Sequence, residues 1–218
     1  MDIKISASIL SADFANLEND IKLCEDIGVD FIHIDVMDGL FVPNLTIGPC
    51  VISSLRKRTK LIFDAHLMIS SPEKYIKDFI DAGCDIITIH IEAVENTRQV
   101  LEKIKSYDVK CGISLKPSTS EEKIYDLLDI VDLVLVMTVE PGFSGQEFME
   151  SQLSKIKNIR KMINQSKREI MLEVDGGINE CTSKLAINAG ANILVSGGYI
   201  FQDKIPKNTV LRLQKIRN

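Results

Sequence analysis

The sequence lacks a basic tract, a paired cysteine motif and an N-terminal apolar run long enough to cross a membrane. Its 218 residues carry a formal net charge of −5, and no run of lysine and arginine could follow a phosphate backbone, so we expect no nucleic-acid partner. The opening segment MDIKISASILSADF has charged residues within its first four positions and a short, interrupted apolar run. We therefore expect neither a signal peptide nor a membrane partner.

The cysteines contain no C-x-x-C pair. Five are scattered along the chain, at Cys24, Cys50, Cys84, Cys111 and Cys181. An odd, dispersed set is typical of free thiols in a reducing compartment, and not of a disulfide framework or a cysteine zinc site. We therefore expect a cytoplasmic protein whose chemistry uses none of its cysteines.

What the sequence does contain is a regular alternation of strand-like and helical segments. The segments that read as strands are 4–10, 31–37, 60–68, 85–90, 109–115, 131–137, 169–174 and 192–196. The helical patterns between them cover 16–28, 47–58, 72–83, a stretch through 100 and 104, a stretch after 120, 148–164, a stretch through 185 and 187, and 207–217.

This alternation predicts the fold. Strands that alternate with helices indicate a parallel sheet, and eight such units in a row indicate a closed (β/α)8 barrel. The composition, 45% hydrophobic and 26% charged, is ordinary for one domain with a large core, and no linker interrupts the chain. We therefore expect an α/β fold of the TIM-barrel type, as a single domain over residues 1–218, with an open doubly wound sheet as the alternative.

Residues 31–49, FIHIDVMDGLFVPNLTIGP, are the most informative stretch. His33, Asp35 and Met37 alternate along a buried strand, so their side chains share one face. A buried imidazole and carboxylate are costly unless they pair or bind a metal, and a simple His–Asp hydrogen bond would satisfy this strand taken alone. The turn signal Asp38-Gly39 then places these groups at the C-terminal end of the strand, where parallel α/β folds carry their chemistry.

Two more strand ends carry matching groups. His66 lies near the end of the third predicted strand and Asp175 directly follows the seventh, in LEVDGGI. With His33 and Asp35 they make two imidazoles and two carboxylates, a donor set that suits one divalent metal ion such as zinc, iron, manganese or cobalt. Each residue alone reads as a satisfied core group, but their shared position at barrel strand ends favours a site.

Other strand-end residues have weaker assignments. His90 and Glu92 share one face after the fourth strand and either support the pocket or form a structural hydrogen bond. Asp64 has the phase of His66 but lies one layer deeper, and we assign it a structural role. Three methionines, which could equally be core filler, are predicted to line the pocket and exclude water: Met37, Met68 and Met137.

Glycine-bearing loops follow the last three strands. They are EPGFSGQ from position 140, Gly176-Gly177 and Gly197-Gly198. Glycine lets backbone N–H groups approach an anion closely, and barrel enzymes commonly hold a phosphate between the loops after strands seven and eight. Together these loops predict one phosphate-binding end of the pocket.

With these motifs in view, the chain resembles the ribulose-phosphate 3-epimerase family over nearly its whole length. The matching segments are SILSADF (8–14), HIDVMDGLFVPNLTIGP (33–49), DAHLM (64–68), VMTVEPGFSGQ (136–146), EVDGGI (173–178) and AGAN (189–192). The resemblance implies a metal-dependent isomerase of the pentose phosphate pathway, which interconverts D-ribulose 5-phosphate and D-xylulose 5-phosphate by proton transfer at C3 through an enediolate.

The resemblance also implies roles for individual residues. Metal binding falls on His33, Asp35, His66 and Asp175, and the acid/base pair on Asp35 and Asp175. Implied substrate contacts are Ser8, His66, Gly142, Phe143, Ser144, Gly145, Asp175, Gly176, Gly177, Gly197 and Gly198. Because the family is known as dimers and hexamers, a homo-oligomer is expected.

The chain departs from the family pattern twice. Ser144 stands where the family often has glycine, and Gly197-Gly198-Tyr199 stands after the eighth strand, where the family usually has Gly-Ser. The second change removes a hydroxyl near the phosphate, so an epimerase for D-allulose 6-phosphate stays an alternative. A non-catalytic sugar-phosphate sensor is less favoured, because it would not need both aspartates and both histidines. A decarboxylating barrel would need a strand-end lysine, and strands two, three and seven lack one.

Overall fold

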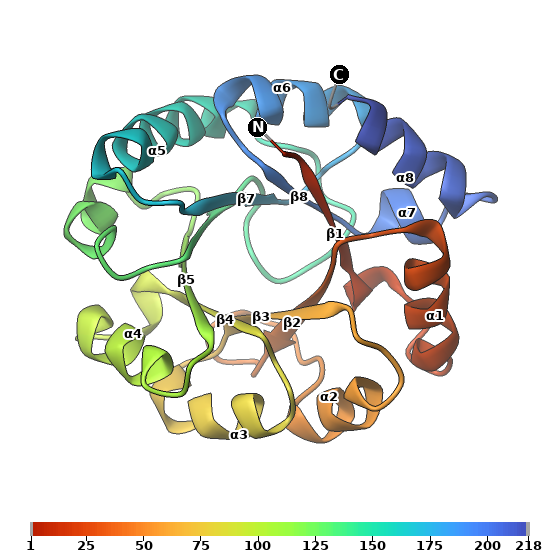
Figure 1. Ribbon diagram of the computed structural model, residues 1–218, viewed down its shortest axis with the longest axis horizontal. Helices are drawn as coiled ribbons and strands as arrows, with labels where there is room; N and C mark the ends of the chain where they lie inside the picture. Colours follow the sequence, from red (N-terminus) through yellow and green to blue (C-terminus); the bar gives the residue numbers. More distant parts are fainter. Residues whose placement is uncertain (1, 217–218) are drawn as a thin grey trace.

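Eight parallel strands form a closed barrel within residues 2–216, the part of the chain that this computed structural model describes, and helices surround it as an outer ring (Figure 1). Each strand pairs with the next along the chain, and β8 pairs with β1, with Ile5 opposite Leu194. The predicted (β/α)8 barrel is therefore confirmed. The open doubly wound sheet is excluded, because it would leave β1 and β8 unpaired.

The strands lie within two residues of their predicted bounds. They are β1 (Lys4–Ser8), β2 (Phe31–Met37), β3 (Ile62–Met68), β4 (Ile86–His90), β5 (Lys110–Leu115), β6 (Leu133–Met137), β7 (Met171–Asp175) and β8 (Ile193–Ser196). The α-helices are α1 (Leu17–Ile27), α2 (Pro49–Arg56), α3 (Ile76–Asp81), α4 (Thr97–Lys105), α5 (Leu153–Ser166), α6 (Glu180–Ala189), α7 (Gly198–Phe201) and α8 (Pro206–Lys215). Short 3-10 turns are η1 (Ile9–Ser11), η2 (Pro72–Lys74), η3 (Ile91–Ala93), η4 (Glu121–Leu127) and η5 (Glu150–Gln152).

The helices differ from the prediction at several ends. The segment after Ser120 is the 3-10 helix η4, whose buried Ile124 and Leu127 lie three apart, the period of a 3-10 helix. Helix α5 starts later than expected because Met149 donates its N–H to a barrel carbonyl, that of Thr138. The segment from Pro72 likewise opens as η2 before α3 begins, and α7 was not predicted because one turn leaves no periodic pattern. Residue 217, the end of the last predicted helix, lies outside the described residues.

The apolar core lies between the barrel and its helices. In β2, Ile32, Ile34 and Val36 belong to this core, whereas His33 and Asp35 take the alternate positions and point into the barrel. The N-terminal end of the barrel interior is closed by the first residues of alternate strands. These are Phe31, Ile86, Leu133 and Ile193. This apolar layer closes the N-terminal end, so the polar interior is open only toward the C-terminal ends of the strands.

The structure shows the state of the five cysteines and the character of the helices. All five cysteines are free in the described structure, and burial raises the pKa of the Cys24 and Cys84 thiols to about 12, so both stay protonated. No helix within residues 2–216 has the length and apolarity that crossing a membrane requires.

Asp38 fastens the loop after β2 to the end of β3. Its Oδ1 accepts the N–H groups of Leu40 and Phe41, both at 2.9 Å, and its Oδ2 accepts the N–H of Ser70 at 2.8 Å and the Ser70 hydroxyl at 2.9 Å. Partial burial alone would raise the pKa of Asp38, but these donors lower it to about 2. The ionised carboxylate therefore stabilises the native state.

This predicts a pH-dependent effect of Asp38→Asn. Because the native pKa lies below the unfolded value of 3.8, the stabilisation is complete above about pH 4 and is lost as the pH falls toward 2. At pH 7 we expect the variant to melt about 2–4 °C below the wild type, the effect of about 1 kcal/mol in a chain of this size. Calorimetry from pH 7 to pH 3 should show the gap narrowing below pH 4. A constant gap would contradict the assignment.

Candidate active site

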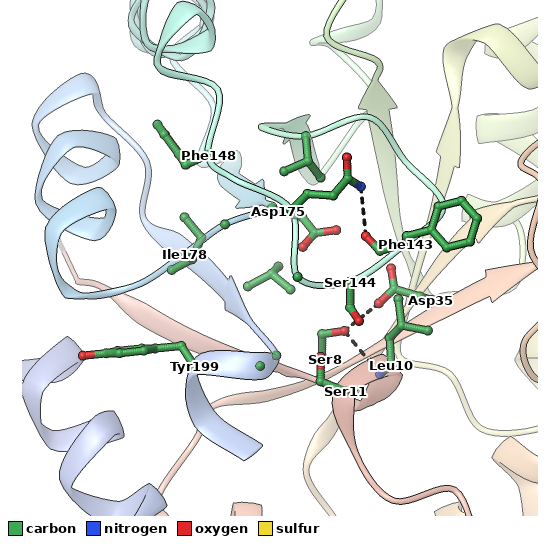
Figure 2. Close-up of a pocket in the computed structure, with 18 of the residues that line it drawn as sticks. Ser8, Leu10, Ser11, Asp35, Phe143, Ser144, Phe148, Asp175, Ile178 and Tyr199 are labelled. Atoms are coloured by element: carbon green, nitrogen blue, oxygen red, sulfur yellow. Dashed lines mark hydrogen bonds between the residues drawn. The ribbon is translucent and has the colours of Figure 1, made fainter. Parts of the chain in front are cut away.

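A cavity of about 730 Å³ opens at the C-terminal mouth of the barrel, and Figure 2 shows side chains from several strand ends and loops around it. All predicted substrate-contact residues line it except His66, which is fully buried beneath its floor. Its lining also includes residues that sequence reasoning missed. Two of them, Gln202 and Asp203, come directly after α7, a helix that the sequence did not predict.

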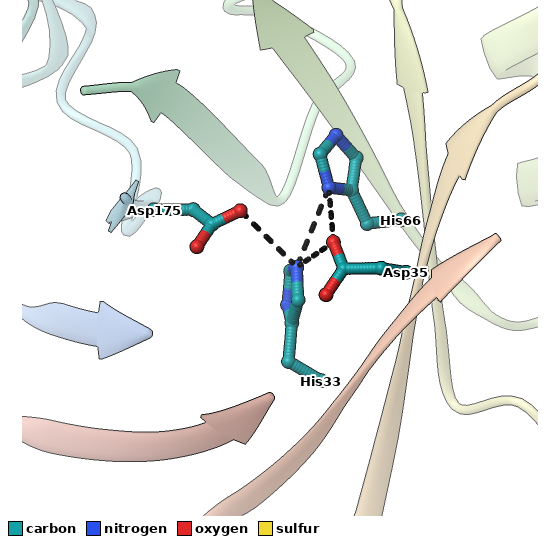
Figure 3. A group of neighbouring side chains, drawn as sticks. All are labelled: His33, Asp35, His66 and Asp175. Atoms are coloured by element: carbon teal, nitrogen blue, oxygen red, sulfur yellow. Dashed lines mark hydrogen bonds and ion pairs between the residues drawn. The ribbon is translucent and has the colours of Figure 1, made fainter. Parts of the chain in front are cut away.

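The four predicted metal ligands converge at the floor of this cavity (Figure 3). One ligand atom from each of His33, Asp35, His66 and Asp175 lies within 4.8 Å of every other. Asp35 Oδ1 is 3.3 Å from His66 Nδ1 and 3.5 Å from His33 Nε2. Asp175 Oδ2 is 4.0 Å from His33 Nε2. Two imidazole nitrogens and two carboxylates thus face one point, a donor set that fits a divalent cation.

The register of the sheet places three of these groups. Asp35 lies opposite His66 in the β2–β3 pair, and the ring of His33 lies one step below Asp35 on the same face. Asp175 comes from β7 across the barrel, where Thr138 donates its hydroxyl to the Asp175 carbonyl at 2.8 Å and so holds the end of β7 against β6. Ser8 donates its hydroxyl to Asp35 Oδ2 at 2.6 Å.

The two carboxyl groups differ in acidity. Burial, and next the nearby charge of Asp35, raise the pKa of Asp175 to about 6. Burial would also raise the pKa of Asp35, but the imidazoles of His33 and His66 hold it well below its usual range. Two chemically similar carboxyl groups therefore favour different protonation states, which is the condition for one to act as a base and the other as an acid.

A deeper layer of polar groups supports the cluster. Asp64, assigned a structural role from the sequence, lies with Oδ2 2.8 Å from His33 Nδ1. Burial alone would lower the pKa of His33, but Asp35 and Asp64 raise it well above its ordinary value. Glu173 lies 3.8 Å from the same His33 nitrogen, and its own pKa is raised well above the usual range by burial and by Asp64.

His90 and Glu92 do not line the cavity but lie behind His66. The ring of His90 is fully buried, with Nε2 2.9 Å from His66 Nε2 and Nδ1 3.1 Å from Glu92. Burial lowers the pKa of His90 to about 4, so this imidazole is neutral near pH 7. Of the two roles that the sequence left open for this pair, support of the site fits these contacts.

The glycine loops pack closely against one another around the mouth. Gly176 has φ +120° and Gly177 φ +65°, and a Cβ at Gly177 would lie 2.4 Å from the backbone nitrogen of Phe148. Asn44 donates its side-chain amide to the carbonyl of Gly142 at 2.8 Å, which joins the loop after β2 to the loop after β6. Close packing of this kind leaves backbone at the cavity surface, where it can face a ligand.

The three methionines lie along the cavity wall. Met37 and Met68 pack with Val42 and Phe41 on one side. Met137 belongs to the apolar cluster inside the barrel on the other side. Each side chain is at most 5% exposed, so this wall is apolar and holds no hydrogen-bonding group of its own.

Comparisons with known proteins identify relatives of this chain. The curated ribulose-phosphate 3-epimerase of Bacillus subtilis is 46% identical over 213 residues, 97% of this chain and 98% of that protein. The chloroplastic ribulose-5-phosphate-3-epimerase of Arabidopsis thaliana is 48% identical over 205 residues, 93% of this chain and 73% of that protein. The solved structure of KGPDC from Streptococcus mutans matches this chain with a TM-score of 0.72 at 18% sequence identity. The match covers 99% of this chain and 97% of that protein, and it shows a similarity of fold alone.

A family model covers nearly all of the barrel. It matches residues 4–201 of this chain, from the first residue of β1 to the last residue of α7. The match therefore contains all four residues of the buried His/Asp cluster and all three glycine loops. The chain belongs to the ribulose-phosphate 3-epimerase family.

Proposed function

We propose that this protein is a ribulose-phosphate 3-epimerase, which interconverts D-ribulose 5-phosphate and D-xylulose 5-phosphate by inverting C3. The observation that carries the proposal is the pair Asp35 and Asp175, two carboxyl groups from β2 and β7 that face a common point and differ in acidity. The inversion needs a base on one face of C3 and an acid on the other. Strands from separate parts of the barrel can supply the two groups from two directions.

The donor set of His33, Asp35, His66 and Asp175 fits one divalent metal ion, with zinc, iron, manganese and cobalt as the candidates. When bound, such an ion supplies Lewis-acid stabilisation of the negative charge that develops on the C2 and C3 oxygens of the sugar. The His33–Asp64 contact of 2.8 Å supports the assignment, because ligating histidines usually have a carboxylate or carbonyl on their remote nitrogen.

The carboxyl groups carry the proton transfers. In one direction the ionised Asp35 removes the C3 proton, which the neighbouring C2 carbonyl makes removable, and the protonated Asp175 returns a proton to the opposite face. In the reverse direction the two residues exchange roles. The hydroxyl of Ser8, 2.6 Å from Asp35 Oδ2, holds that carboxylate in place. The planar enediolate between the two steps is the common intermediate.

The rest of the cavity positions and protects the sugar. Backbone groups of the loops at Gly142–Gly145, Gly176-Gly177 and Gly197-Gly198 bind the phosphate and thereby hold C3 between the two aspartates. The apolar wall of Met37, Met68 and Met137 excludes water that would otherwise quench the intermediate. We further propose that the protein works in the cytoplasm as a homo-oligomer, a dimer or a hexamer.

The deciding experiment is proton NMR of the purified protein with ribulose 5-phosphate in deuterium oxide. We expect xylulose 5-phosphate with deuterium at C3, no reaction after chelation, and recovery when a divalent metal is returned. Product that keeps its C3 proton would contradict exchange through an enediolate. Reaction of allulose 6-phosphate without reaction of ribulose 5-phosphate would move the assignment to the six-carbon sugar, for which Gly198 in place of serine is the sequence reason.

A further inference from the structure

A chain of hydrogen bonds runs from His66 away from the cavity. His66 Nε2 lies 2.9 Å from His90 Nε2, and the two ring centroids are 4.9 Å apart. His90 Nδ1 then lies 3.1 Å from Glu92 Oε2. Both rings are fully buried, and the Glu92 side chain is 20% exposed. This series of hydrogen bonds therefore joins the proposed metal position to a carboxylate near the surface through two imidazoles.

Glu92 is held as a hydrogen-bond acceptor at the outer end. Its Oε1 accepts the backbone N–H of Lys116 at 2.9 Å and the hydroxyl of Thr119. An ionised carboxylate has only acceptor sites. The remaining oxygen, Oε2, therefore needs a donor, and His90 Nδ1 lies within reach of it.

The need for a donor at Glu92 Oε2 determines which ring nitrogen carries the proton in His90 and in His66. Two imidazole nitrogens 2.9 Å apart share one proton, so either His66 donates to His90 or His90 donates to His66. A neutral His90 that donates to Glu92 from Nδ1 has a bare Nε2, which must accept from His66. His66 then carries its proton on Nε2 and presents a lone pair on Nδ1, the nitrogen that lies 3.3 Å from Asp35.

The opposite order would be unfavourable at the Glu92 end. If His90 donated from Nε2, its bare Nδ1 would face the lone pairs of Glu92. The neutral ring of His66 would then carry its proton on Nδ1, directed at Asp35 Oδ1 at 3.3 Å and at the point where the four ligand atoms converge. Asp35 already accepts the Ser8 hydroxyl at 2.6 Å, whereas Glu92 Oε2 has no donor other than His90 among the described residues. A proton on His66 Nδ1 blocks coordination, because a metal binds the nitrogen lone pair.

We propose that Glu92 and His90 are positioning residues, which hold His66 in the tautomer that directs the Nδ1 lone pair to the metal position. The metal part of this inference rests on the proposed function, whereas the tautomers are a property of the metal-free chain. His33 is held by a separate carboxylate, since its Nδ1 lies 2.8 Å from Asp64 and leaves Nε2 for the site. The two ligand histidines (Figure 3) thus use different nitrogens, each selected from behind.

Glu92→Gln tests the proposal because a glutamine at this position reverses the direction of the hydrogen bonds that link residue 92, His90 and His66. Lys116 offers a backbone N–H, so the glutamine oxygen must turn to it, and the NH₂ group then faces His90 Nδ1. His90 becomes an acceptor at Nδ1 and a donor at Nε2, which forces the proton of His66 onto Nδ1. The matched control is Glu95→Gln, which removes the same charge from an exposed glutamate three residues along the chain.

The measurement is long-range proton–nitrogen NMR of the metal-free protein, in which the three histidines give three ring patterns. We expect His66 protonated on Nε2 and His90 on Nδ1 in the wild type and in Glu95→Gln, and both patterns inverted in Glu92→Gln. Calorimetric titration with Co²⁺ should show about 10- to 100-fold weaker binding to Glu92→Gln, the usual effect of losing a group behind a metal ligand.

Either of two results would overturn the inference. One is a wild-type His66 protonated on Nδ1, which needs no variant to detect. The other is unchanged tautomers in Glu92→Gln. If the wild type shows the expected tautomers and loses them in Glu92→Gln, but does not epimerise ribulose 5-phosphate, the positioning role holds and the proposed function fails.

Discussion

Asp175→Asn is expected to lower kcat by about 10⁴-fold, the upper end of what one positioned acid or base contributes, while the protein stays folded. Asparagine keeps the size of the side chain but can neither remove nor return the C3 proton. Melting of the metal-free variant at pH 7 should occur at the wild-type temperature or above it. Burial and Asp35 raise the pKa of Asp175 to about 6, so the ionised carboxylate disfavours the native state as the pH rises from 3.8 through 6, and asparagine removes that cost.

The same variant distinguishes a two-base scheme from a single base. With Asp175 replaced, Asp35 can still exchange the C3 proton of the epimer whose hydrogen faces it, but no epimer is formed. Asp35→Asn should slowly exchange the proton of the other epimer. Deuterium uptake at C3, measured separately for ribulose 5-phosphate and xylulose 5-phosphate, reads this directly. Exchange of the same epimer by both variants, or a wild-type rate in Asp175→Asn, would rule the scheme out.

Gly177→Ala is expected to damage both stability and substrate binding. The added Cβ would lie 2.4 Å from the nitrogen and 2.7 Å from the Cα of Phe148, and backbone atoms cannot yield as a flexible side chain does. Overpacking of this kind costs about 1–3 kcal/mol, and the φ of +65° adds about 1 kcal/mol of left-handed strain for alanine. Because the loops after β6 and β7 must separate, the phosphate position shifts, and kcat/KM should fall about 100-fold.

Gly28→Ala is the matched control. Gly28 ends α1 with φ +78°, and a Cβ there meets nothing within 4 Å. An alanine at position 28 therefore has the left-handed backbone strain without a steric overlap, and the position lies away from the cavity. We expect a loss of about 1 kcal/mol in the free energy of unfolding and no change in KM. Equal effects of the two substitutions on KM would contradict a role for the Gly177–Phe148 contact in substrate binding.

Local patterns in the sequence were sufficient for the architecture. The strand bounds followed from runs of β-branched residues between turn signals, and the end of α1 followed from Gly28, which has the left-handed φ of a helix cap. The helix ends that differed depend on distant contacts. Met149 stays extended because it bonds the Thr138 carbonyl of the barrel, and no local pattern encodes that bond.

The candidate site was likewise predictable from the sequence only in part. The alternation of His33, Asp35 and Met37 was visible in the sequence, because side chains two apart on a strand must share a face. That the same face also carries partners from β3 and β7 follows from closure of the barrel, which joins β8 to β1 and brings Asp175 to 4.0 Å from His33.

The amino-acid sequence by itself determined the fold, the family resemblance and the candidate residues, since periodicity, turn chemistry and motifs are local. Only the tertiary structure decided which groups touch. It placed His90 against His66, fixed Glu92 through Lys116 and Thr119, and set Gly177 against the backbone of Phe148. These contacts join residues from different strands and loops, and their distances depend on the register and closure of the whole sheet.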